Sequence, residues 1–115
     1  MASHIAALTR YLIVALLFVP CSTHAAEKDQ LSAKGKALLQ GKCARCHSIE
    51  LTGDSPLKQA PPMRTIYRRF NEKELRAELS EGMVSRHKEM PQIQFSDEDT
   101  YAIMTYLYTL ATARK

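Results

Sequence analysis

The chain lacks three features that would assign it to large classes of protein. Its apolar run Tyr11–Val19 has about half of the roughly twenty residues that a membrane-spanning helix needs. It has no long Lys/Arg tract and no basic stretch with interleaved aromatic residues, so no nucleic-acid groove is predicted. No segment after residue 25 shows the alternation typical of a strand. The 115 residues therefore predict at most one small all-α domain.

The N-terminus has the composition of a secretory signal peptide. One cation, Arg10, precedes the apolar run, Pro20 ends that run, and small residues follow up to Ala25. We predict cleavage after Ala25, which divides the chain into a signal peptide, residues 1–25, and one exported domain, residues 26–115. A periplasmic protein without stable membrane insertion is expected, and an uncleaved amphipathic anchor is the alternative.

Periodicity predicts four helices separated by long loops. Ser32, Asn71 and Ser96 are the expected N-caps, and Glu74 lies three residues after Asn71 as in a capping box. The helices are expected at residues 30–42, 63–70, 71–82 and 96–110. A short chain built in this way buries little apolar surface, so we expect a large apolar cofactor to complete its core.

The scarce cysteines are the main chemical signal. Cys21 falls in the signal peptide, whereas Cys43, Cys46 and His47 form a C-x-x-C-H motif. This spacing lets two thiols bond to the two vinyl groups of a haem, and the adjacent histidine then ligates the iron. Zinc would need a fourth ligand, with His87 as the candidate. A redox dithiol would follow a strand, and none is predicted there. A structural disulfide across two residues would constrain little of the chain.

A haem of this kind needs a second axial ligand downstream. Met90 is the candidate, because it lies in the loop before the last helix, and a soft thioether ligand raises the reduction potential. Met83 and His87 are the competing ligands. Met63 and Met104 are assigned to the hydrophobic core.

Four stretches combine these motifs, namely "GKALLQGKCARCHSIE", "APPMRTIYRRF", "EGMVSRHKEMPQIQFSDED" and "YAIMTYLYTL". Together they resemble the small monohaem class I cytochromes c of bacteria over residues 32–110. The resemblance implies an all-α class I cytochrome c fold, with short helices and loops around one covalent haem c. It also implies that Gly35 lets the first and last helices cross closely, with Leu39 packing against Ile103 and Tyr106.

The resemblance further implies the roles of residues near the haem. The carbonyl of Pro61 is expected to accept the Nδ1 proton of the iron-ligating His47, with Pro56 as the fallback. The chain has no tryptophan, which some members of this family place near a haem propionate. Tyr67 or Arg64 is expected to serve there instead.

An iron with His47 and Met90 as ligands has no open position, so the expected function is one-electron transfer without catalysis. The alternative is a haem-bearing, electron-accepting subunit of a periplasmic oxidoreductase such as a dehydrogenase. Redox partner proteins are expected in both cases. Cations near the motif would steer an acidic partner, unless they only keep the surface soluble. They are Lys34, Lys36, Lys42, Arg45, Lys58, Arg64, Arg68, Arg69 and Lys88.

Overall fold

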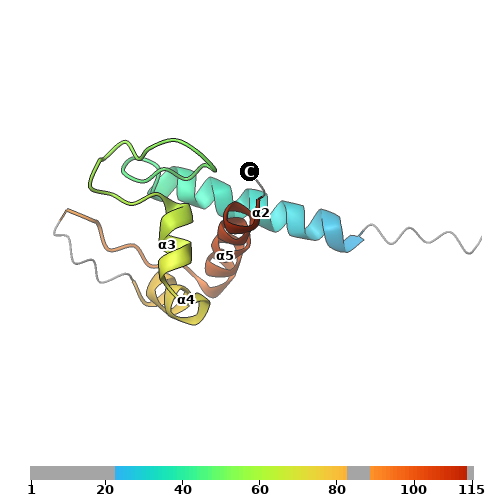
Figure 1. Cartoon of the computed structure of the whole chain (residues 1–115). Coiled ribbons are helices and arrows are strands. Elements are labelled where there is room, and N and C mark those ends of the chain that lie inside the picture. The colour runs from blue at the N-terminus through green and yellow to red at the C-terminus, as the bar shows by residue number, and fades with distance from the viewer. Residues whose placement is uncertain (1–22, 83–88, 114–115) are drawn as a thin grey trace, which may run out of the picture.

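The structure, a computed structural model, describes residues 23–82 and 89–113. Within these ranges the chain forms helices and loops, without strands. Figure 1 shows the helices in chain order, which are α2 (Thr23–Lys42), α3 (Met63–Arg69), α4 (Glu72–Glu81) and α5 (Asp97–Thr112). A long loop between α2 and α3 folds back beside α3. The predicted all-α architecture is confirmed.

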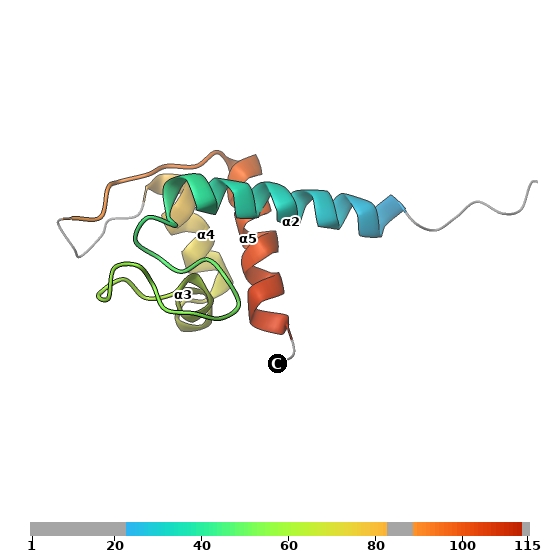
Figure 2. The same cartoon turned by 90° about the horizontal axis from the view of Figure 1, so that it is seen from above.

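The crossing of α2 and α5 organises the fold, as Figure 2 shows from above. Gly35 lies at the crossing, where an added Cβ atom would overlap the carbonyl oxygen of Ala102 and lie 2.9 Å from the Ile103 nitrogen. Leu39 and Ile103 are almost wholly buried there, and Tyr106 is buried beside them. The predicted close crossing at a glycine is confirmed.

Two ion pairs also join α2 to the start of α5. The Lys34 ammonium lies 2.7 Å from the Glu98 carboxylate and 2.8 Å from that of Asp99. The hydrogen bond to Asp99, followed by that to Glu98, raises the pKa of Lys34. The hydrogen bond with Lys34 lowers the pKa of Asp99. Because Glu98 is exposed and Lys34 and Asp99 are only partly buried, water screens the attraction, and the apolar crossing contributes more to stability.

The predicted start of the first helix at Ser32 is wrong. α2 begins at Thr23 and continues through Ser32, with an exposed first part that extends beyond the crossing in Figure 2. The stretch before Ser32 contains alanine, glutamate and lysine but no glycine or proline, so its helix propensity is high and nothing ends the helix there. The predicted cleavage position after Ala25 therefore falls in the first turn of α2; residues 1–22 lie outside the described ranges.

The other predicted caps are confirmed. The Asn71 side chain accepts a hydrogen bond of 2.9 Å from the Glu74 backbone nitrogen at the start of α4. The Ser96 hydroxyl accepts one of 3.1 Å from the Asp99 nitrogen at the start of α5. α4 ends at Glu81 and is followed by Gly82 as C-cap, whose φ of 89° is a value that residues with a side chain rarely adopt.

The core lies on the inner sides of all four helices. Met63 and Met104 are both buried in it, as predicted. Leu75 and Leu79 supply the buried face of α4. Among the described helices, none is both long and apolar enough to span a membrane.

Candidate functional site

The C-x-x-C-H motif forms a tight turn at the end of α2. The Cys43 nitrogen donates a hydrogen bond of 2.8 Å to the carbonyl of Leu39, which extends the last turn of the helix. The His47 nitrogen then donates one of 2.9 Å to the Cys43 carbonyl. Cys43 and Cys46 are both half-buried and are not bonded to each other. The turn thus presents two free thiols next to a histidine.

The His47 ring is buried, with 8% of the residue exposed, and its orientation is defined by one hydrogen bond. Its Nδ1 lies 2.7 Å from the carbonyl oxygen of Pro61, just before α3. A carbonyl only accepts, so Nδ1 must carry the proton, which leaves the lone pair of Nε2 available to a metal in the neutral ring. Metal-ligating histidines commonly have such a carbonyl partner. In this structure the carbonyl partner of His47 is Pro61, and Pro56 makes no hydrogen bond to His47.

An apolar pocket lies beside this turn, between the helices and the segment that leads into α5. It is lined by Leu39, Cys43, Met63, Ile66, Leu75, Leu79, Met90, Pro91, Ile93, Phe95, Ile103 and Leu107. No charged side chain is among these residues. The pocket brings Cys43 and Met90 together from opposite halves of the chain.

These residues fit a covalently attached haem. The uncharged lining suits the chemistry of an apolar ring, because burying apolar surface against hydrocarbon is favourable. A thiol lies in the wall, a second thiol and a histidine follow in the same turn, and the thioether of Met90 lies in the wall on another segment. Cysteine thiols, a neutral imidazole and a thioether are the groups that hold c-type haem.

The environment of Cys43 is unlike that of a redox-active dithiol. Burial raises the pKa of the Cys43 thiol to about 11, and the nearby Cys46 adds to the increase. Redox dithiols need the opposite, a lowered pKa that yields the thiolate. For zinc, the described residues contain no three His, Cys, Asp or Glu side chains placed to hold one ion. The proposed fourth zinc ligand, His87, lies outside the described residues, as does Met83.

Neither residue expected near a propionate lines the apolar pocket. The Arg64 guanidinium is instead hydrogen-bonded to the loop after His47, including the Gly53 carbonyl at 2.7 Å. Tyr67 lines a separate hollow that also contains Tyr101 and Tyr108. The structure gives no support to a propionate role for Tyr67.

Two of the cations that were expected to steer an acidic partner form ion pairs within the chain. Lys34 contacts the start of α5, as described above, and Lys36 lies 2.9 Å from the Glu50 carboxylate. Lys42, Arg45 and Lys58 are exposed and have no acidic partner within ion-pair distance among the described residues. Lys88 lies outside the described ranges.

One buried hydrogen bond near the site was not predicted from the sequence. The Tyr106 hydroxyl donates a hydrogen bond of 2.8 Å to the carbonyl of Ile49, two residues after His47. The sequence indicated only that Tyr106 packs in the crossing of the two helices. No local pattern signals this bond, because its partners lie far apart in the chain.

Comparison with known proteins gives one match. A family described as Cytochrome c matches residues 32–111, which include the motif turn, the apolar pocket and all of α5 except its last residue. No curated protein and no solved structure matches the chain.

Proposed function

Since this chain belongs to the cytochrome c family, a family of haem-based electron-transfer proteins that bind haem c covalently, we propose that it is a periplasmic one-electron carrier with His47 and Met90 as iron ligands. The observation that carries the proposal is the hydrogen bond from His47 to Pro61. It orients the imidazole of the same turn whose Cys43 lines the apolar pocket together with Met90.

Each residue has a distinct task in this proposal. Cys43 and Cys46 form the thioether bonds, and His47 ligates through Nε2 while Pro61 accepts its Nδ1 proton. Met90 contributes a soft, neutral ligand that favours the ferrous state. When bound, the haem supplies a one-electron iron couple. The apolar lining excludes water, which disfavours the more highly charged ferric state and raises the potential.

The proposed localisation and partner follow from charge and from the N-terminus. Export through residues 1–25 would bring the chain to the compartment where c-type haem is attached. Lys42, Arg45 and Lys58 are exposed cations in or near the motif turn and the loop after it. We expect them to attract an acidic redox partner at low salt, with an association rate that falls as salt rises.

The test is the absorption spectrum of the protein exported by a host that attaches c-type haem. The wild type should show low-spin covalent haem and the near-infrared methionine–iron charge-transfer band. Met90→Ala should lose this band completely, bind exogenous ligands such as imidazole, and have a lower reduction potential, because water or a harder ligand replaces the thioether.

Three variants serve as controls for the methionine assignment. Met104→Leu preserves the volume of a buried core residue and should keep the band. Met83→Leu and His87→Ala remove the competing ligands and should also keep it. A Met90→Ala protein with an unchanged band and potential would show that another residue ligates the iron. Haem that is not covalently attached in the wild type would refute the proposed function itself.

A further inference from the structure

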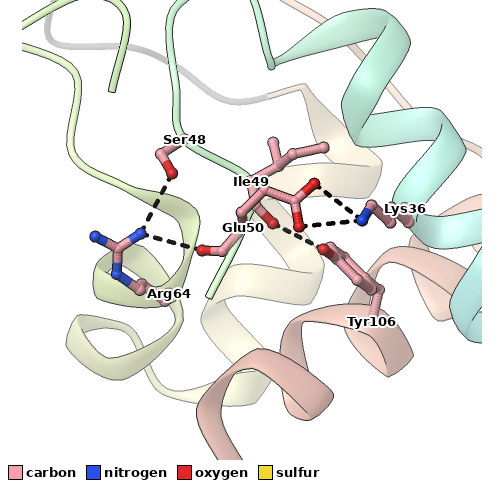
Figure 3. A network of polar contacts seen from close by, with 6 residues as sticks. All are labelled: Lys36, Ser48, Ile49, Glu50, Arg64 and Tyr106. Atoms are coloured by element: carbon pink, nitrogen blue, oxygen red, sulfur yellow. Dashed lines mark hydrogen bonds and ion pairs between the residues drawn. The ribbon is translucent and has the colours of Figure 1, made fainter. Parts of the chain in front are cut away.

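The loop that follows His47 is fastened to α3 by one arginine. The Arg64 guanidinium donates hydrogen bonds to the Ser48 hydroxyl at 3.3 Å, the Glu50 carbonyl at 3.1 Å and the Gly53 carbonyl at 2.7 Å. Figure 3 shows the first two of these contacts. One terminal nitrogen contacts Ser48 and Glu50 and the other contacts Gly53, so both ends of the fork bind the loop.

Backbone contacts align the same two segments closer to the histidine. Pro61 accepts from His47, and the Met63 nitrogen donates a hydrogen bond of 2.9 Å to the carbonyl of Ser48. Arg64 is the next residue along and contacts the next part of the loop. The His47–Pro61 bond is thus the first of a row of contacts, and Arg64 closes the other end of that row.

Two further helices hold the opposite side of this segment, as Figure 3 shows. The Tyr106 hydroxyl of α5 binds the Ile49 carbonyl, and Lys36 of α2 pairs with the Glu50 carboxylate. The Lys36 pair is exposed and therefore worth little. Two of the three Arg64 bonds are exposed as well, but the guanidinium joins three points of the loop to α3, and its bond to Ser48 is part-buried. Since hydrogen bonds from a charged donor are stronger than neutral ones, Arg64 is a polar fastening on the α3 side.

We propose that Arg64 is a positioning residue for His47. By holding the loop against α3 it keeps the His47–Pro61 hydrogen bond short, and a short bond raises the basicity of the ligating imidazole. A more basic imidazole donates more electron density and favours ferric iron, so loss of the fork should raise the reduction potential. This inference rests on the proposed function, because it requires His47 to ligate the iron.

The choice of variant separates geometry from charge. Removal of a positive charge near the iron would lower the potential, opposite to the effect of a weaker Nδ1 hydrogen bond. Arg64→Lys retains the charge but cannot reproduce the planar fork. The matched control is Arg69→Lys, the same change at an exposed position of the same helix.

Two quantities are measured on the haem-loaded proteins. NMR of the diamagnetic ferrous state gives the solvent-exchange rate of the His47 Nδ1 proton, and equilibrium titration gives the reduction potential. Arg64→Lys should accelerate exchange by about tenfold, because loss of a hydrogen bond to a charged group makes local opening more frequent. Its potential should shift upward, and Arg69→Lys should match the wild type in both quantities.

Tyr106→Phe is a second variant that loosens the same segment from the α5 side without any change in charge. It should shift exchange and potential in the same directions. If both variants lower only the unfolding midpoint and leave exchange and potential unchanged, the residues act on stability alone and the inference is wrong. If the wild type shows no iron ligation by His47, the proposed ligand set fails before Arg64 is considered.

Discussion

Replacing Gly35 by alanine is expected to lower the free energy of unfolding by about 3 kcal/mol, at the upper end of the usual cost of overpacking. The new Cβ would overlap the carbonyl oxygen of Ala102, which is helix backbone and cannot rotate away. α2 and α5 must then separate, which loosens the packing of Leu39 and Ile103, both almost fully buried. The gain in helix propensity, about 1 kcal/mol, offsets only part of this cost.

Denaturant unfolding of the haem-loaded protein, followed by far-ultraviolet circular dichroism, measures this effect. Gly41→Ala is the matched control, since it makes the same change in the same helix where no atom beyond the adjoining backbone of that helix lies within 4 Å of the added carbon. The control should be as stable as the wild type or slightly more stable. Equal stability for both variants would mean that the helices do not cross as closely as described.

Replacing Cys43 and Cys46 together by alanine is expected to abolish covalent haem attachment and, with it, compact folding. Four of the twelve residues that line the apolar pocket are only partly buried or exposed, namely Cys43, Met90, Pro91 and Ile93, and without the haem this part of the wall would stay open to water. A domain of this size has little other apolar surface to stabilise it. The helices α3 and α4 are short as well, and isolated helices of such length are marginal in water.

Haem staining after denaturing electrophoresis, mass spectrometry and circular dichroism test the two parts of this expectation. Cys21→Ala removes the cysteine of the predicted signal peptide and should leave haem content unchanged. A double variant that carries no haem yet unfolds cooperatively would contradict the view that the cofactor completes the core. Covalent haem that persists in the double variant would remove both cysteines from the proposed site.

The helices and their caps could be predicted because the interactions that define them are local. Asn71 with Glu74, and Ser96 with Asp99, lie within one turn of each other, so neighbouring residues decide where these helices begin. The start of α2 could not be predicted in the same way. Ser32 has the chemistry of an N-cap, but the preceding stretch is also a good helix former, and continuation of the helix satisfied more backbone hydrogen bonds.

The sequence by itself determined the C-x-x-C-H motif and the all-α class, because these depend on spacing and on local periodicity, whereas the helix crossing at Gly35 was implied by the family resemblance. Only the tertiary structure decided that Arg64 binds the loop after His47 and that Tyr106 reaches the Ile49 carbonyl. It also decided that Pro61 rather than Pro56 contacts His47. These contacts join residues far apart in the chain, and their geometry depends on how the loop between α2 and α3 folds back against the helices.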